Sequence, residues 1–231
     1  MRITPCAFIR PPKARAVEVA CAPDAHRQAL PGLPGTSFVR VLAAGPDPEA
    51  IRGALQHLML AGALEVDHHP RMFIYRAVHE GRRWMGLVCA VDTRDLVPLI
   101  YESATPEEIH EAEAARRAIG AQLNPALVRV QPSEEAAYLF VTDMNERPAY
   151  HFRSHDDSTH SAWHVHKPDL YTKLFTEVTP LEVLHGGAHL MTAHLAGVPA
   201  LAILSADVDS TLAAGGLAPR AGLFVGAPRD A

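Results

Sequence analysis

The segment that organises this sequence begins Tyr150-His151-Phe152-Arg153-Ser154-His155-Asp156-Asp157-Ser158-Thr159-His160-Ser161-Ala162-Trp163-His164 and continues to His194. Apolar and aromatic residues alternate with polar ones on both sides of residues 156–159, and this period of two is typical of half-buried strands. Asp and Ser side chains bond their own backbone in turns, so residues 156–159 are expected to connect two strands. The segment therefore predicts a β-hairpin.

The predicted hairpin gathers histidines on one of its faces. With residues 156–159 as the loop, His155 is expected opposite His160, and His151 opposite His164. Zinc binds three or four N, O or S ligands at about 2 Å, and four imidazoles on one surface suit it. The alternative interpretation is the polar face of an amphipathic hairpin in a chain with 14 histidines, because no zinc-finger or His-Glu-x-x-His spacing is present.

The second part of the segment reads Leu184-His185-Gly186-Gly187-Ala188-His189. Just before it, residues 179–182 (Thr-Pro-Leu-Glu) have the pattern of a capping box and predict the start of a helix. Each glycine weakens such a helix by about 1 kcal/mol. His185 and His189 are four residues apart, so a helix places them on one face, as a ligand-binding pair or a structural pair at a buried helix end.

The composition bounds the class of protein. The chain has 231 residues, 48% of them hydrophobic, which is enough for a sizeable core. A net charge of −5 without basic runs argues against nucleic-acid and anionic-membrane partners. Cys6, Cys21 and Cys89 show no close pairing, which indicates reduced thiols in a cytoplasm. No apolar run reaches membrane-spanning length, so we expect a soluble cytoplasmic protein.

Local signals place several other elements. Asp47 as N-cap with Pro48 at the first position predicts a helix that ends at Gly62, and a capping box at residues 105–108 opens a helix that ends near Gly120. Further strands are predicted at 3–9, 16–20, 37–42, 71–79, 83–91, 126–130, 138–141, 200–204 and 223–225, and further helices at 168–178 and 207–214. Strands pair locally and helices intervene irregularly, which indicates an α+β fold with mixed or antiparallel sheets. We expect one domain over residues 1–231, with residues 168–231 as a candidate C-terminal subdomain.

Taken in order, several segments resemble a known family. Pro5-Cys6-Ala7-Phe8-Ile9-Arg10-Pro11 is similar to an opening Pro-Phe-x-Ala-x-Arg-Pro, Met72-Phe73-Ile74-Tyr75-Arg76 to a tyrosine-containing hairpin, and His160-Ser161-Ala162-Trp163 to a His-x-x-Trp strand. Weaker similarities lie at residues 17–24, 37–41, 101–106 and 217–224. The family is the bacterial and archaeal domain of unknown function 1015, and the order of the segments carries the resemblance.

The resemblance implies a core related to the ParB and sulfiredoxin group, and in some members a kinase activity on free serine with a nucleotide or pyrophosphate donor. It also marks His160 and Trp163 as ligand-binding residues. The family signature Asp-Gly-His-His-Arg is replaced here by residues 185–189, and only Gly186 survives; the family's His-Glu turn becomes Tyr101-Glu102. The changes remove a metal-binding carboxylate and an arginine clamp for phosphates, so we expect weakened or lost phosphotransfer.

Three hypotheses follow. A phosphotransferase would hold a phosphorylated or pyrophosphate-bearing ligand, with Mg²⁺, over the amides of Gly186 and Gly187, with Glu102 as base and His185 and His189 as anion or metal contacts. A regulatory protein would bind a small metabolite or a partner protein without turnover. A zinc-binding module or metal-dependent hydrolase would use the hairpin histidines. A small-molecule ligand is expected in the first case and the oligomeric state is open in all.

Overall fold

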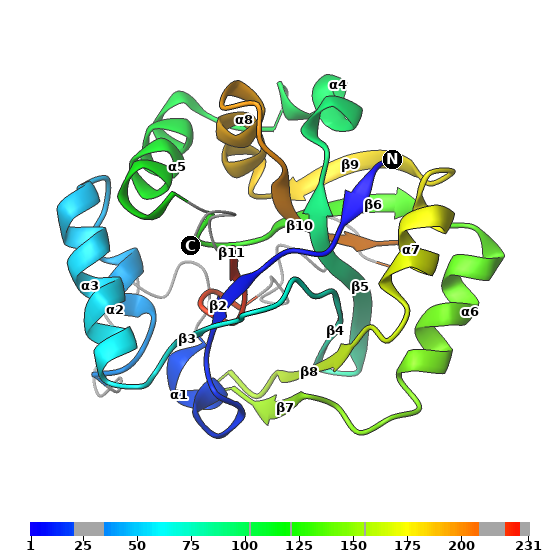
Figure 1. Ribbon diagram of the computed structural model, residues 1–231, viewed down its shortest axis with the longest axis horizontal. Helices are drawn as coiled ribbons and strands as arrows, with labels where there is room; N and C mark the ends of the chain where they lie inside the picture. The colour runs from blue at the N-terminus through cyan, green and yellow to red at the C-terminus, as the bar shows by residue number, and fades with distance from the viewer. Residues whose placement is uncertain (21–34, 102, 121, 155, 208–219, 227–231) are drawn as a thin grey trace.

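The computed structural model describes residues 1–20, 35–101, 103–120, 122–154, 156–207 and 220–226. The predicted α+β class is confirmed: helices surround a main sheet and a small second sheet (Figure 1). The main sheet contains β1 (Ile3–Thr4), β4 (Phe73–His79), β5 (Arg82–Val91), β6 (Ala126–Gln131), β7 (Tyr150–Arg153), β8 (Thr159–His164), β9 (Thr179–His185) and β10 (Ala200–Ser205). The small sheet contains β2 (Phe8–Arg10), β3 (Glu65–Val66) and β11 (Val225–Gly226).

The helices vary widely in length. The longer ones are α3 (Pro48–Leu60), α5 (Pro106–Ile119), α6 (Glu134–Asp143), α7 (Pro168–Phe175) and α8 (Gly187–Leu195). Single turns form α1 (Ala16–Val19), α2 (Val39–Leu42), α4 (Val97–Ile100) and the 3₁₀ helices η1 (Lys13–Arg15) and η3 (Thr93–Leu96). Among the described residues, none of these helices has the length and apolar character that a membrane crossing requires.

The main sheet runs in the order β7-β8-β4-β5-β10-β6-β9, and β1 pairs with β5. Every pairing is antiparallel except that of β10 with β6. β10 comes late in the chain but lies between β5 and β6, so the candidate subdomain at residues 168–231 contributes strands to the same sheet as the rest of the chain.

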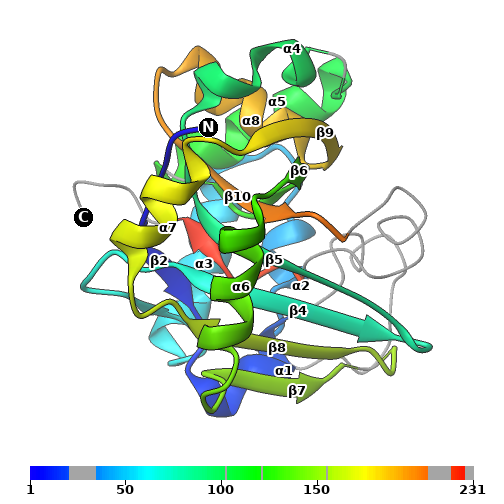
Figure 2. The ribbon, with the colours of Figure 1, turned by 90° about the vertical axis from the view of Figure 1, so that its right-hand side faces the viewer.

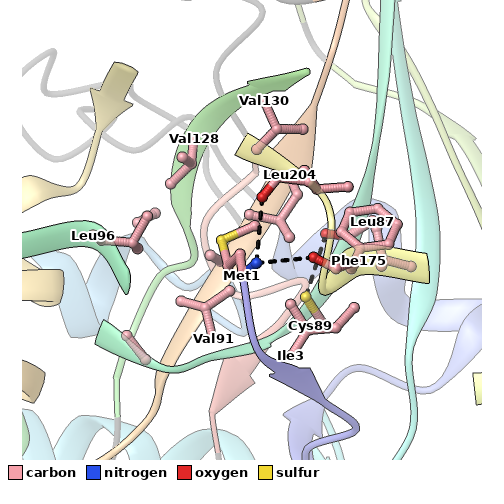
Figure 3. Close-up of a cluster of buried hydrophobic side chains, with 14 of the residues drawn as sticks. Met1, Ile3, Leu87, Cys89, Val91, Leu96, Val128, Val130, Phe175 and Leu204 are labelled. Carbon is pink, nitrogen blue, oxygen red and sulfur yellow. Dashed lines mark hydrogen bonds between the residues drawn. The ribbon is translucent and has the colours of Figure 1, made fainter. Parts of the chain in front are cut away.

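Successive side chains of β5 point to opposite faces of the sheet, so the strand contributes to two separate hydrophobic clusters. Leu87 and Cys89 point to one side of the sheet, where α6 and α7 pack, and Trp84 and Val88 point to the other. The first cluster includes the side chain of Met1, whose amino group donates to the carbonyl oxygen of Phe175 at 3.0 Å (Figure 3). The same amino group donates to the carbonyl oxygens of Thr176, at 2.9 Å, and Val178, at 3.3 Å, just after α7. These bonds hold the start of the chain against α7.

Elements with strong local signals form as predicted. The Asp47 side chain caps α3 by accepting from the amide of Glu49, and the capping box of Thr105 and Glu108 opens α5, which ends at Gly120 in the left-handed conformation. β4 and β5 form the predicted hairpin, with positive φ at both residues of its turn, Glu80 and Gly81. The predicted strands at 126–130 and 200–204 and the helix at 168–178 are also present, while residues 208–214 of the remaining predicted helix lie outside the described part.

Four local predictions are wrong. The predicted strands at 16–20, 37–42 and 138–141 are the helices α1, α2 and α6, because a short apolar run does not distinguish a strand from one buried face of a helix. For α6 the helix signal was the N-cap Ser133, whose side chain accepts from the amide of Ala136. The capping-box pattern at 179–182 instead begins β9, an edge strand, which is where a sheet tolerates a proline such as Pro180.

Candidate functional site

A polar pocket lies where β9 ends and α8 begins. Its cavity of about 350 Å³ is bounded by the turn at His185 and Gly186, by one face of α5 and by the segment around Leu42. The described lining residues are Val41, Leu42, Ala43, Gly45, Ile51, Ser103, Glu108, Glu111, Ala112, Ala115, Leu123, Asn124, Leu184, His185, Gly186, Gly187, Ala188 and His189. The pocket therefore contains the four residues 185, 186, 187 and 189 that the sequence singled out.

Gly186 and Gly187 lie so close to neighbouring segments that neither position has room for a Cβ atom. Gly186 has a φ of +75°, and a Cβ atom there would lie 2.9 Å from the Cα of Ala126. A Cβ atom on Gly187 would lie 2.1 Å from Ser103 Oγ and 2.5 Å from the Ser103 carbonyl oxygen. Any side chain at these positions would push α8 away from β6 and from the segment before α5.

The first turn of α8 has no side-chain cap among the described residues. The amides of His189 and Leu190 donate to the carbonyl of Gly186, at 3.0 and 3.3 Å. The amides of Gly187 and Ala188 precede these and have no carbonyl of their own helix to bond. Since both residues line the cavity, the start of α8 can offer its amides and the positive end of its dipole to an anion.

The prediction that His185 and His189 share one helix face is wrong. His185 is the last residue of β9 and His189 lies in the first turn of α8, yet both line the cavity. Burial lowers the pKa of His189 to about 4, and the charges of His185 and Arg116 act in the same direction. His189 is therefore neutral at pH 7 and can donate or accept a hydrogen bond, but it brings no permanent charge to an anion.

The facing wall of the pocket is acidic and amide-bearing. Glu108 and Glu111 of α5 line it, and the Glu108 carboxylate already accepts from the amide of Thr105, at 2.8 Å, in the capping box. The side-chain oxygen of Asn124 is buried, and no described residue donates to it. Glu102, the predicted base, lies outside the described residues, although Ser103 beside it lines the cavity.

The histidine hairpin forms, but its predicted register is wrong. β7 and β8 pair Phe152 with His160 and His151 with Ser161, so His151 and His160 point to opposite faces of the sheet. The connection is longer than a four-residue loop and contains Asp157 with a φ of 62°. That longer connection shifts the pairing and separates the imidazoles.

The structure does not bring together the described members of the predicted zinc site. His151 is exposed and lies 2.9 Å from Ser161 Oγ, His160 is buried on the other face, and His164 pairs across the sheet with Phe73. Within the described ranges no three His, Cys, Asp or Glu side chains are placed to share a metal ion. His155 lies outside those ranges, so the full four-histidine set stays a prediction.

His160 instead lies in a buried hydrogen-bond network. Its Nδ1 is 2.7 Å from the Tyr75 hydroxyl, and its Nε2 accepts from Arg220 Nε at 2.9 Å and lies 2.7 Å from Ser158 Oγ. An arginine only donates, so the ring proton sits on Nδ1 and is donated to the oxygen of Tyr75. Burial and the charge of Arg220 lower the pKa of His160 to about 3, which keeps the ring neutral.

A carboxylate closes this network on its solvent side. Arg220 is only 3% exposed and pairs with Asp156, which also accepts from Ser154 Oγ at 2.5 Å and from Ser158 Oγ at 2.6 Å. Burial acts to raise the pKa of Asp156, but the hydrogen bonds from Arg220 and the two serines outweigh it and hold that pKa below its usual range. The sequence predicted no role for Arg220, because Arg220 and His160 are 60 residues apart and no local motif joins them.

The predicted ligand set of Gly186, Gly187, His160 and Trp163 is not brought together. Four strands, β4, β5, β10 and β6, separate β8 from β9 in the main sheet, and both views show β8 and β9 far apart (Figures 1 and 2). Trp163 is 5% exposed, donates to the carbonyl of Glu146 at 3.0 Å and lies under the guanidinium of Arg76. Its contacts are those of a core residue.

The fold and the pocket define an α+β protein with a polar cavity at a strand-to-helix turn. The chain belongs to the family described as Protein of unknown function (DUF1015), whose sequence model matches residues 3–192. The match includes the β9–α8 turn and the histidine hairpin but ends before residues 217–224, where the sequence also resembled the family. No curated protein and no solved structure matches the chain.

Proposed function

We propose that the chain binds a small phosphorylated metabolite in the pocket at the β9–α8 turn, and that phosphotransfer is weakened or lost. The observation that carries the proposal is the first turn of α8, which lies at the cavity wall and takes no side-chain cap from any described residue. Backbone amides at a helix N-terminus form an anion site without any charged side chain. A cavity of about 350 Å³ is at the small end of the range for ligand pockets, which suits a small metabolite.

The two walls suggest how such a ligand lies. Its phosphate faces the amides of Gly187 and Ala188, with the neutral ring of His189 as a further hydrogen-bond partner and His185 beside it in the lining. A positively charged group on the ligand, or an accompanying Mg²⁺ ion, suits the opposite wall with Glu108 and Glu111. The ligand is a free metabolite of a cytoplasm, and neither nucleic acid nor a membrane is part of the proposal.

The composition of the lining supports binding more than turnover. Phosphoryl transfer needs a cation on the transferred group, and among the described residues that line the cavity none is Lys or Arg. His189, with its pKa near 4, does not replace that charge at pH 7. We also propose that the chain is related to the ParB and sulfiredoxin group and to serine kinases. The first ligands to test are therefore phosphoserine, serine with a phosphate donor, and pyrophosphate.

The test is a thermal unfolding series with phosphoserine, L-serine, ATP, ADP or pyrophosphate, each with and without Mg²⁺. A ligand at about 100 times its Kd stabilises the native state by about 2.7 kcal/mol and should raise Tm by about 5 °C or more. The variant His189→Gln should reduce this shift. The matched control His194→Gln changes a histidine of the same helix that does not line the pocket, and should keep it. The proposal is wrong if no phosphorylated compound raises Tm, or if both variants respond like the parent protein.

A further inference from the structure

Two neighbouring helices carry apolar side chains that no described residue covers. α6 and α7 lie side by side on one flank of the molecule (Figure 2), with Phe140 stacked on Tyr171 at 5.8 Å and the Tyr171 hydroxyl donating to Asp143 at 2.8 Å. The ring centroids of Phe140 and Phe175 are 6.4 Å apart. The two helices are therefore antiparallel, with the start of α6 beside the end of α7.

The outer faces of this pair form an apolar groove. Tyr138 is 71% exposed, Val141 56% and Leu170 37%. A cavity of about 540 Å³ lies between the helices and is lined by Glu134, Glu135, Tyr138, Leu139, Leu170 and Leu174. Single exposed apolar residues are ordinary, but a contiguous patch with polar edges is typical of a protein-binding surface.

The edges of the groove carry opposite charges. Glu134 and Glu135 lie at the start of α6 and line the groove, and Lys173 lies next to Leu174 near the end of α7. Within the described ranges these three side chains form no ion pair with one another or with any other group. Since the helices are antiparallel, the acidic and the basic edge lie at the same end of the groove.

We infer that this groove is covered by the same groove of a second copy of the chain. A two-fold axis parallel to the helices places α6 of each copy against α7 of the other. Tyr138 and Val141 then meet Leu170 and Leu174 of the second copy, and Glu134 and Glu135 meet its Lys173. The surface is complementary to itself in both apolar and charged groups, which is the requirement for an isologous dimer, and the four helices form an antiparallel bundle.

The expected association is weak. The two helices have 10 and 8 residues, and their outer faces are smaller than the roughly 800 Å² per partner of a standard interface. Dimers should therefore form in the micromolar range, and their population should depend on protein concentration. None of the groove residues lines the β9–α8 pocket, so this inference stands independently of the proposed ligand.

Sedimentation equilibrium of the full chain, from about 1 μM to about 1 mM, tests the inference. The weight-average mass should rise towards twice the monomer mass across this range. Tyr138→Lys should prevent the rise, whereas the matched control Leu60→Lys, at a side chain that is 90% exposed on α3, should not. A parent protein that stays monomeric throughout, or a Tyr138→Lys variant that still dimerises, overturns the inference.

A charge exchange tests the orientation of the two copies. The double variant Glu134→Lys, Glu135→Lys should weaken dimerisation by about tenfold or more, and adding Lys173→Glu to the same chain should restore it. All three residues are exposed, so circular dichroism should show an unchanged fold in each variant. If the triple variant is folded but remains monomeric, the proposed pairing of α6 with α7 is wrong.

Discussion

Two histidine-bearing regions of this molecule differ in how completely their polar groups are paired. Around His160 both ring nitrogens have partners, and Arg220, which bonds Nε2, also holds Asp156 at the solvent edge. In the β9–α8 pocket no described side chain caps the first turn of α8, and none of the same residues donates to the side-chain oxygen of Asn124. The first region is closed and the second is open to a cavity.

The difference shows which observation points to a ligand. Buried polar groups almost always have hydrogen-bond partners. A network in which every group has a partner within the protein therefore gives no reason to expect a ligand. Polar groups that stay unpaired beside a cavity are unusual, and a ligand or water is what pairs them. By this criterion the abundance of histidine in the hairpin carries less information than two glycines and an uncapped helix.

The largest expected effect comes from opening the closed network. Arg220→Met leaves the carboxylate of Asp156 and the ring of His160 without their main donor, and should lower the free energy of unfolding by about 3 kcal/mol, at the low end for a broken buried pair. The low end is expected because the Asp156 side chain is 40% exposed and stays partly hydrated. Urea unfolding monitored by circular dichroism measures the loss.

Arg117→Met is the matched control for this substitution. Arg117 bonds Glu113 on the surface of α5, and its own side chain is 67% exposed. Exposed pairs of this kind contribute about 0.5 kcal/mol or less. If both variants lose the same free energy of unfolding, the His160 network contributes no more to stability than the exposed pair of Arg117 and Glu113.

A smaller loss of stability is expected from adding a side chain at the β9–α8 turn. Gly187→Ala places a methyl group against Ser103 and should cost about 2 kcal/mol, because backbone and not only a flexible side chain must move. Gly53→Ala in α3 meets nothing within 4 Å and should stabilise the protein by about 0.5–1 kcal/mol. Differential scanning calorimetry should therefore show shifts of Tm in opposite directions, and a neutral Gly187→Ala would mean that α8 does not need its close contact with Ser103.

The effect that is smallest for a single pH unit is the contribution of one histidine to the pH dependence of stability. Burial lowers the pKa of His160 to about 3 and of His189 to about 4, so below the unfolded value of about 6.5 the unfolded chain binds protons that the native protein does not. Stability should therefore fall as the pH falls from about 6.5 towards 4, by at most about 1.4 kcal/mol per pH unit for each histidine. His189→Gln should remove one of the two contributions and flatten the slope of unfolding free energy against pH. An unchanged slope would show that His189 titrates normally in the folded protein.

Local signals explain what could be predicted from the sequence. The caps of α3 and α5 and the β4–β5 hairpin form as expected, because their determinants, such as Asp47 and Thr105, act within a few residues of themselves. A short apolar run fits a strand and one buried helix face equally well, and in α6 the local signal that distinguishes them is the N-cap Ser133. The pattern at 179–182 fits a capping box equally well, and only pairing with β6 makes it a strand.

The sequence indicates which residues form the candidate site, but it does not indicate how they are arranged in space. Residues 185–189 stand at the place of the family signature in the sequence, and they line a cavity. Their division between a strand and a helix depends on the contacts of Gly186 with Ala126 and of Gly187 with Ser103, which lie about 60 and 84 residues away by sequence number. Arg220, Asp156 and Tyr75 became a single network only through the fold.

The place of β10 in the sheet has a consequence for how the chain folds. β5 and β6 do not pair with each other in the described sheet; β10 alone joins the part with β7, β8, β4 and β5 to the part with β6 and β9. During synthesis both parts have an open edge until residues 200–205 have left the ribosome. Such late, long-range pairing slows folding and leaves strand edges exposed to other chains, so truncation before Ala200 should yield an aggregating product.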